Sequence, residues 1–362
     1  MIGIYTFWNV PNYGAFSQAY ALNNVVRNIE NSEEVYHIGY LHPAHHDLYY
    51  VRKKPVANSF VSYLNPKFYK KMIEAILCPE VKYTKLQTAW NEIPHINFEN
   101  KDKLESKRWD SVILGSDCIW EYSVGEFGDD IHLIGNNLNS DNILSYAASF
   151  GNMNVGDNFR EFVADGLKKL NFISVRDKTT YDIVKNLSGR ESEIVLDPTF
   201  LWDFKNDEKI IKPIHDNYIL VYGGNFDKKI VEQIKDYAKK NNLTIIGAGS
   251  CPKWCDIKKY GISPFEWLGY FKYANCVATC MFHGLMFSIN FNKKVYFNQV
   301  EYVKNRSQWL LEVTGLEKFN KQKSVEYVFD SNWDYEDIEN KLSTYKIKSL
   351  NYLKKSLGHT SD

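Results

Sequence analysis

Short apolar runs alternate with amphipathic segments along the first half of the chain. Residues 2–7, 111–114 and 143–147 have the length and composition of strands, and residues 15–27 and 159–170 place apolar side chains at helical spacing. Apolar strands that alternate with helices are typical of parallel sheets covered on both faces. The pattern therefore predicts an open α/β sheet.

The alternation is interrupted once and then begins again. Residues 203–217 are polar and include Pro213, which is typical of a linker. A new apolar run starts at Tyr218, and the segment 263–266 (Ser-Pro-Phe-Glu) predicts a helix that begins with a capping box. We therefore predict an α/β protein with two Rossmann-like, doubly wound domains facing across a cleft. The predicted parts are an N-terminal domain at 1–202, a linker at 203–217, a C-terminal domain at 218–335, and a C-terminal helix and tail at 336–362.

His283 lies where a strand is predicted to end and a helix to begin. Residues 276–280 form an apolar run, and the residues after Gly284 have the composition of a buried helix. Ligands of open α/β sheets bind at the carboxyl ends of strands. An imidazole at a helix N-terminus, beside a glycine that lets a substrate approach, can hold or protonate an anion. The alternative is a histidine satisfied by backbone groups inside the core.

Two further loops with polar groups follow predicted strands. Asn12-Tyr13-Gly14 precedes a helix, where free backbone N–H groups can face a phosphate; a simple capped turn is the alternative. Asp117 follows Gly115-Ser116 at the end of an apolar strand. Its carboxylate could take a proton from a sugar hydroxyl, or it could cap the next helix.

Arginine and lysine side chains also lie at predicted strand or helix ends. Arg176 could form a planar fork for a carboxylate or phosphate, or pair with Asp177 or another nearby acid. Lys304 and Arg306 precede a predicted helix at 309–311 and could bind an anion, although a solvated surface position is the alternative. Together these groups suit a small, highly anionic substrate.

The composition argues against several other classes of protein. The 362 residues include 44 basic and 44 acidic side chains, so no overall charge draws the chain to nucleic acid. The sequence holds no Walker loop, no HExxH zinc motif and no Gly-x-Ser-x-Gly elbow. Two cysteine pairs, Cys251 with Cys255 and Cys276 with Cys280, could suggest a metal site, but core or loop thiols are the preferred interpretation. We expect no metal.

The sequence also predicts a location. Residues 1–7 are apolar without a basic prefix, and no stretch approaches the ~20 apolar residues of a membrane span. We expect a cytoplasmic protein. Within residues 42–77, however, three lysines at 67, 70 and 71 lie beside apolar side chains. This segment could be a basic amphipathic helix that touches anionic lipid on the inner face of the membrane; an ordinary helix packed on the N-terminal domain is the preferred interpretation.

Several short motifs follow one another in a fixed order. They are Asn12-Tyr13-Gly14-Ala15 with Gln18-Ala19-Tyr20-Ala21-Leu22, Leu114-Gly115-Ser116-Asp117 with Trp120, Ser145-Tyr146-Ala147-Ala148-Ser149-Phe150-Gly151, Ser174-Val175-Arg176-Asp177, Leu196-Asp197-Pro198-Thr199, and Phe282-His283-Gly284 with Phe287-Ser288. In this order, from about Ile2 to Leu316, the chain resembles the polysaccharide pyruvyl transferase family. Cys118 departs from the family pattern, in which glutamine is common at that position.

The resemblance implies a glycosyltransferase-B-like pair of domains, with the acceptor on the N-terminal side and the donor on the C-terminal side. It implies phosphoenolpyruvate as donor and co-substrate, with no cofactor. The acceptor would be a sugar of a surface polysaccharide precursor, usually linked to polyprenyl diphosphate, and the product a cyclic pyruvate ketal. His283 and Arg176 match the family's active-site histidine and arginine, and either Lys304 or Arg306 matches a further basic residue.

The predicted site combines proton transfer with anion binding. His283 is the candidate general acid or acid/base, and Asp117 the candidate base. The predicted donor-binding residues are Arg176, Lys304, Arg306 and Gly284, and the predicted acceptor-binding residues are Asn12, Gly14 and Ser116. Two rival functions fit the same scaffold: a glycosyltransferase that uses a nucleotide sugar, and a saccharide-binding protein without catalysis.

Overall fold

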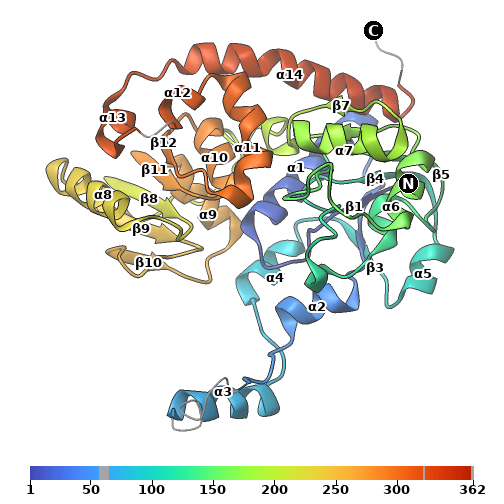
Figure 1. The fold of residues 1–362 in the computed structure, drawn as a ribbon, viewed down its shortest axis with the longest axis horizontal. Coiled ribbons are helices and arrows are strands. Elements are labelled where there is room, and N and C mark those ends of the chain that lie inside the picture. Colours follow the sequence, from blue (N-terminus) through green and yellow to red (C-terminus); the bar gives the residue numbers. More distant parts are fainter. Residues whose placement is uncertain (57–64, 321–322, 360–362) are drawn as a thin grey trace.

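The fold contains two five-stranded parallel sheets with the same strand order. The structure is a computed structural model that describes residues 1–56, 65–320 and 323–359, with the side chain of Asn320 excepted (Figure 1). The first sheet has the order β3-β2-β1-β4-β5, and every neighbouring pair is parallel. Its strands are β1 (Ile2–Tyr5), β2 (Val35–Gly39), β3 (His95–Asn97), β4 (Arg108–Leu114) and β5 (Asn139–Ser145).

The second sheet repeats this arrangement in the C-terminal half. Its order is β10-β9-β8-β11-β12, again parallel throughout. Its strands are β8 (Tyr218–Tyr222), β9 (Thr244–Ala248), β10 (Ile257–Lys259), β11 (Cys276–Thr279) and β12 (Lys294–Phe297). The predicted α/β class with two Rossmann-like, doubly wound domains of glycosyltransferase-B type is therefore confirmed.

A short parallel pair extends the first sheet. The pair is β6 (Ser174–Val175) with β7 (Glu193–Ile194). Single parallel bridges from Leu144 to Phe172 and from Ala148 to Val175 join β6 to the edge beyond β5. The residues that follow β6 and β7 therefore lie at the same edge of the sheet as those that follow β4.

Helices connect the strands and cover both sheets. In the N-terminal half these are α1 (Tyr13–Glu30), α2 (Pro43–Tyr50), α3 (Pro66–Leu77), α4 (Thr84–Trp90), α5 (Lys101–Ser106), α6 (Glu161–Lys169) and α7 (Lys178–Ser188), with 3₁₀ turns η2 (Gly125–Phe127), η3 (Ile131–Ile134) and η4 (Pro198–Phe200). In the C-terminal half they are α8 (Lys228–Lys240), α9 (Pro264–Lys272), α10 (Phe282–Asn290), α11 (Glu301–Thr314), α12 (Glu317–Asn320), α13 (Val325–Asp330) and α14 (Tyr335–Ser356).

Aromatic side chains join the two halves. Phe16 and Tyr20 of α1 pack edge-on against Phe265 of α9. The Tyr13 ring stacks on Trp267 at 5.5 Å between centroids. These rings belong to one continuous apolar cluster that includes residues of both halves. Burial of aromatic surface thus holds the halves together.

Helix α14 returns from the C-terminal half to the N-terminal half (Figure 1). Tyr345 packs against Trp309 of α11. Farther along the same helix, the Tyr352 hydroxyl donates to the Ser145 carbonyl at 2.8 Å, and the Ser349 hydroxyl accepts from the Leu196 N–H at 2.9 Å. The chain therefore crosses between its halves twice, once at residues 203–217 and once within α14.

The sequence prediction missed some elements and misplaced others. Strands β2, β3 and β10 were not predicted; β3 and β10 are only three residues long and lie at the sheet edges. Helix α9 begins with the predicted capping box between Ser263 and Glu266. Helix α11 begins at Glu301, so Lys304 and Arg306 lie within the helix and not in a loop before it.

The segment 42–77 differs from its preferred interpretation. It contains α2 and α3, and residues 57–64 lie outside the described part. The prediction that an ordinary helix packs its apolar face on the N-terminal domain is wrong for α3. Ala75 is the only residue of α3 classed as buried, and Ile73, Ile76 and Leu77 are exposed.

We predict that buried His37 makes the fold sensitive to acid. Its side chain in β2 is fully buried, with Nε2 3.1 Å from the Ala19 carbonyl. Burial lowers the pKa of His37 to about 3. Below pH ~6.5, His37 therefore binds a proton in the unfolded chain but not in the folded chain. The free energy of unfolding should then fall by about 3 kcal/mol between neutral pH and pH ~4.5 on account of this residue.

The His37→Gln variant keeps an N–H donor for Ala19 but does not titrate. Urea unfolding at several pH values should show that the variant loses about 3 kcal/mol less than the wild-type chain over this range. His46→Gln, at a half-exposed position, is the control for a histidine substitution at the surface and should leave the free energy of unfolding at neutral pH close to the wild-type value. Equal pH dependence in His37→Gln and the wild-type chain would contradict the prediction.

Candidate active site

The site lies where the two sheets reverse their strand order. In each sheet the first strand has the second strand on one side and the fourth on the other. Connections therefore leave in opposite directions at β1 and β4, and at β8 and β11, which opens a crevice at the carboxyl ends of these strands. Asp117 follows β4 at one crevice, and His283 follows β11 at the other.

His283 is the second residue of α10 and is packed between the halves. Its side chain is 9% exposed, and Nε2 is buried without a hydrogen-bond partner. A Cβ atom added to Gly14 would lie 2.2 Å from His283 Nδ1, so the glycine of α1 lies directly against the imidazole. No side chain caps α10, which leaves the positive end of this helix at the site. The alternative interpretation was a histidine whose ring nitrogens are hydrogen-bonded inside the core. It does not hold for Nε2, which has no hydrogen-bond partner among the described residues.

The electrostatic surroundings of His283 come from both halves of the chain. Burial lowers the pKa of His283, as do the charges of Arg176 and Arg306, whereas Asp117 and Asp197 act to raise it. The net direction is downward, so the imidazole is neutral at pH 7 in the free protein. Bound anionic charge would change that balance.

Arg176 is buried and paired with two carboxylates. Nη1 donates to Asp197 at 2.8 Å, and Nη2 donates to Asp117 at 2.9 Å. The side chain is 1% exposed, and Nη2 also lies 3.2 Å from the Cys118 sulfur. The expected free fork for a donor anion is therefore occupied. Asp177 is not its partner, because that carboxylate accepts from Ser149 and Thr180 at the start of α7.

Asp117 is a poor candidate for the base that the sequence suggested. Its Oδ1 accepts from Arg176 and from the Cys118 N–H at 2.8 Å. Burial would raise the pKa of Asp117, but the positive charge of Arg176, the electrostatic influence of His283, and the hydrogen bonds from Cys118 and Arg176 outweigh burial and lower that pKa to about 2. A carboxylate this acidic accepts protons weakly. Its position favours a role as counter-charge for His283.

Arg306 and Lys304 lie on different faces of α11. Lys304 is 55% exposed and pairs with Glu301 at 3.7 Å. Arg306 points inward, where Nη1 lies 3.1 Å from the Cys118 sulfur, Nη2 donates to the Tyr302 carbonyl, and Nε is buried without a partner. Two positions along a helix differ by about 200° in direction, which explains the contrast.

The Arg306 guanidinium has no carboxylate within 4.0 Å in the described part of the chain. Its sulfur neighbour does not supply a negative charge, because burial raises the pKa of the Cys118 thiol to about 11. A partly buried guanidinium without a carboxylate partner is costly, so this position favours a bound anion. Arg176, Asp117 and Glu121 also act electrostatically on Arg306.

Two other predicted site residues, Gly284 and Ser116, take part in the packing of the site. A Cβ at Gly284 would lie 2.2 Å from Thr279 Oγ1, so this glycine lets α10 approach β11 and does not face an open space. Ser116 is fully buried, and its hydroxyl donates to Gln18 at 2.8 Å. The contacts of Gly284 with the donor and of Ser116 with the acceptor stay predictions.

Asn12 caps the first turn of α1, as in the alternative interpretation of its loop. Its Oδ1 accepts from the N–H groups of Gly14 and Ala15 at the start of α1. The neighbouring Tyr13 donates from its hydroxyl to the Ile262 carbonyl at 3.1 Å, across to the C-terminal half. The loop therefore connects the His283 neighbourhood with the junction of the two halves.

A cavity of about 440 Å³ lies at this junction. It is lined by Pro11, Tyr13, Lys82, Tyr83, Thr84, Lys85, Leu86, Gly249, Gly261 and Ile262. The lining comes from both halves, and Lys85 forms an ion pair with Glu266 at 3.0 Å across them. The volume lies within the range of ligand pockets, and Tyr13 places the cavity one residue from Gly14.

Sequence reasoning did not single out two features of this region. Asp197 was taken as the end of a strand, although its carboxylate pairs with Arg176 and also accepts from Thr199. The cavity residues 82–86 lie far from the motifs in sequence, so no local signal identified them. The Asp-Pro pair at 197–198 was the available signal, since it follows a strand in the same way as Asp117.

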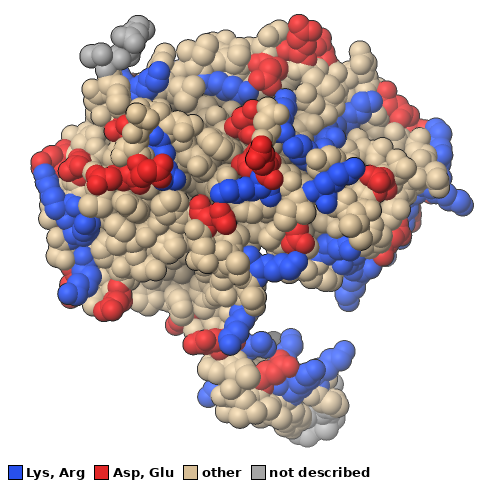
Figure 2. All heavy atoms as spheres, turned by 180° about the vertical axis from the view of Figure 1, so that it is seen from behind, with Lys and Arg blue, Asp and Glu red and all other residues tan. Residues whose placement is uncertain are grey.

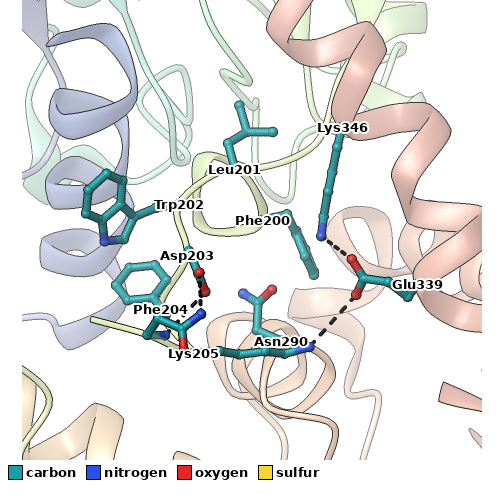
Figure 3. A pocket seen from close by; sticks show the side chains of 10 residues that line it. Phe200, Leu201, Trp202, Asp203, Phe204, Lys205, Asn290, Glu339 and Lys346 are labelled. Carbon is teal, nitrogen blue, oxygen red and sulfur yellow. Dashed lines mark hydrogen bonds and ion pairs between the residues drawn. The ribbon is translucent and has the colours of Figure 1, made fainter. Parts of the chain in front are cut away.

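A second cavity, of about 360 Å³, lies elsewhere, between the linker and α14 (Figure 3). Its charged side chains neutralise one another: Lys346 pairs with Glu339 at 2.6 Å, and Lys205 approaches the same carboxylate. None of the residues around His283 lines it. In the described residues, no group of three or more His, Cys, Asp or Glu side chains could hold a metal ion.

The fold and the paired crevices define a two-domain α/β protein of glycosyltransferase-B type. The sequence model of the polysaccharide pyruvyl transferase family matches residues 12–297. Because this match covers most of the chain, the chain belongs to the polysaccharide pyruvyl transferase family, and the protein is a pyruvyl transferase enzyme. No curated protein gives a significant match.

Several solved structures share the general architecture. The S. aureus MnaA-UDP co-structure has a TM-score of 0.47 at 12% identity and covers 100% of this chain and 97% of its own. The UDP-GlcNAc 2-epimerase of Methanocaldococcus jannaschii in complex with UDP-GlcNAc and UDP has a TM-score of 0.36 at 13% identity, covering 95% and 99%. The E. coli heptosyltransferase WaaC with ADP has a TM-score of 0.36 at 11% identity, covering 82% and 87%. At these values the likeness carries no information about function.

We predict that Gly14→Ala displaces the His283 ring. The added methyl group cannot occupy a position 2.2 Å from Nδ1, so the imidazole must move. Pyruvyl transfer should fall by about 10²-fold or more, because proton transfer depends on position. The ring signals of His283 in a ¹H–¹³C NMR spectrum should shift. Gly156→Ala is the control, since nothing lies within 4 Å of its added carbon. Unchanged activity and ring signals in Gly14→Ala would contradict this view of the contact.

Proposed function

We propose that the enzyme transfers the pyruvate unit of phosphoenolpyruvate to a pair of hydroxyl groups on a saccharide, forming a cyclic ketal and releasing phosphate. The observation that carries the proposal is the partly buried Arg306 guanidinium, whose Nε is buried without a partner, which has no carboxylate within 4.0 Å in the described chain, and which acts electrostatically on His283. An anionic donor would supply the missing negative charge.

The proposed donor fits the polarity of the site. Phosphoenolpyruvate carries a carboxylate and a phosphate, and Arg306 together with the uncapped start of α10 offers positive charge to such groups. The orphan Nε2 of His283 lies buried at the same place. Arg176 is paired with Asp117 and Asp197 and holds these carboxylates in place. We therefore assign Arg176 a positioning role.

The proposed reaction begins with a proton. Donor anions near His283 raise its pKa, so the imidazole gains the proton that the free protein lacks. His283 then protonates the methylene carbon of the donor, which leaves an oxocarbenium-like centre at the adjacent carbon. One sugar hydroxyl adds to this centre and gives up its proton to His283. The C–O bond to phosphate then breaks, which restores an oxocarbenium-like centre at the same carbon. The second hydroxyl adds there to close the ketal ring, and its proton passes to the released phosphate.

Asp117 supports this cycle without accepting the substrate proton. Its carboxylate stays ionised, since its pKa is about 2, and it favours the protonated form of His283. Arg176 and Asp197 fix its position through the ion pairs at 2.9 and 2.8 Å. The acid and the later base are then the same imidazole at different stages.

We propose that the saccharide acceptor occupies the cavity of about 440 Å³ beside Tyr13. Tyr13 and Tyr83 offer aromatic faces for sugar rings, and Gly14 connects the cavity to His283. Lys82 and Lys85 on its rim suit the diphosphate of a polyprenyl-linked acceptor. The acceptor would be a precursor of a surface polysaccharide.

We predict that Arg306→Gln weakens donor binding about 10- to 100-fold. This is the range expected for the loss of charge-assisted hydrogen bonds to an anion. Isothermal titration calorimetry with phosphoenolpyruvate measures the change. Lys304→Gln is the matched control on the same helix, and its affinity should equal that of the wild-type chain.

Two results would reject the assignment of the donor. Equal affinity for phosphoenolpyruvate in Arg306→Gln and the wild-type chain would place the donor elsewhere. A rise in the melting temperature with UDP- or GDP-sugars, and none with phosphoenolpyruvate, would favour the glycosyltransferase alternative.

We predict that donor binding is coupled to proton uptake by His283. The pKa of His283 is lowered in the free protein and should rise beside bound anions, so uptake should approach about one proton per donor near pH 7. Calorimetry in buffers of different ionisation enthalpy measures this number.

The His283→Asn variant separates this proton from any taken up by the donor itself. Its proton uptake should be smaller than that of the wild-type chain, and its rate of phosphate release should fall by about 10²–10⁴-fold. Equal uptake in both proteins would show that His283 does not gain the proton.

A further inference from the structure

Helix α3 stands away from the rest of the molecule on an arm of two chain segments (Figure 1). A bridge pairs Val51 with Glu80, and the Val81 N–H donates to the Tyr50 carbonyl at 2.9 Å. Of the twelve residues in α3, Ala75 alone is classed as buried. The helix therefore does not contribute its apolar side chains to the core.

The apolar side chains of α3 form one exposed stripe. Tyr69, Ile73, Ile76 and Leu77 are 44%, 52%, 57% and 73% exposed. Their spacing of four, seven and eight residues places them on one face of the helix. An exposed apolar stripe of this kind on a protruding helix indicates an interaction surface.

Basic residues surround this stripe. The arm and helix, residues 51–56 and 65–81, carry six basic side chains, at Arg52, Lys53, Lys54, Lys67, Lys70 and Lys71, and two acidic ones, at Glu74 and Glu80. Glu74 is already paired with Arg52 at 3.3 Å. Figure 2 shows an uncharged surface on this lobe with blue side chains along its border. The surface is thus apolar in the centre and positive at the edge.

We propose that α3 docks on an anionic lipid bilayer. An amphipathic helix with this arrangement places its apolar face at the boundary between headgroups and acyl chains, while its lysines contact lipid phosphates. Such a helix lies in the plane of the interface and does not need to span the membrane. In the residues that the structure describes, no helix has both the length and the apolar content to cross a bilayer.

The arm leads directly to the cavity at the junction of the two halves. Residues 82–86, which follow the arm, line that cavity. Docking of α3 would therefore bring the cavity near the bilayer from which a polyprenyl-linked saccharide extends. This last step rests on the proposed function, whereas the docking of α3 does not depend on the identity of donor or acceptor.

Vesicle sedimentation with the full chain tests the proposal without any enzyme assay. The protein should bind vesicles of phosphatidylcholine with about one third phosphatidylglycerol, and bind vesicles of phosphatidylcholine alone much more weakly. The Lys67→Glu/Lys70→Glu/Lys71→Glu variant should lose about 100-fold in partitioning. The Ile73→Asp/Ile76→Asp variant should lose at least about tenfold.

Matched changes elsewhere separate a local effect from general charge or hydropathy. Lys228→Glu/Lys235→Glu/Lys239→Glu alters three exposed lysines of α8, and Ile214→Asp alters a side chain that is 88% exposed. Both controls should partition like the wild-type chain, and all variants should keep the wild-type melting temperature.

Absence of binding to anionic vesicles, or equal losses in the controls and the α3 variants, would overturn the proposal. So would a dimer, measured by light scattering, that Ile73→Asp/Ile76→Asp dissociates while vesicle binding stays at the wild-type level. Retained phosphate release in vesicle-free solution, together with lost vesicle binding in the α3 variants, would support docking and leave the proposed chemistry intact.

Discussion

The site depends on one partly buried arginine, Arg306, that has no carboxylate within 4.0 Å among the described residues. Burying an ionised side chain costs several kcal/mol, and a carboxylate partner normally offsets this cost. Arg176 follows that rule with Asp117 and Asp197, whereas Arg306 contacts a protonated thiol and a carbonyl oxygen. In the proposed function, the two arginines therefore have different roles: Arg176 fixes the site, and Arg306 leaves positive charge available. His283 lies in the field of both, and its pKa is lowered in the free protein.

Much of the fold could be predicted from the sequence, because buried parallel strands are continuous apolar runs. Tyr218–Tyr222 was predicted from such a run, and the capping box at Ser263 identified the start of α9. Edge strands such as β3 and β10 are short and half-buried, so they lack this signal. Helix α3 has a helical pattern, but a pattern of apolar positions does not say whether another element covers them. Only the arrangement in space shows that this stripe is open.

The candidate site was less predictable than the fold. The sequence could place Asp117, Arg176 and His283 at strand ends, and the structure brings them together because those ends meet at the two crevices. The sequence could not show that the guanidinium group of Arg176 is already paired with carboxylates, since its partner Asp197 lies 21 residues away. The choice between Lys304 and Arg306 depended on knowing that α11 begins at Glu301. Gly284 and Ser116 also take part in close packing and hydrogen bonding, which the sequence did not indicate.

Two crossings of the chain limit how the halves can move. One crossing, at residues 203–217, is irregular, and the other lies within the continuous helix α14, which contacts Trp309 on one side and Leu196 on the other. Two attachment points restrict relative motion largely to rotation about the line between them. Gly14 and His283 come from opposite halves, so such a rotation would part the glycine from the imidazole. Opening of the cleft would then expose the ring to solvent and raise its proton affinity, which links domain motion to protonation.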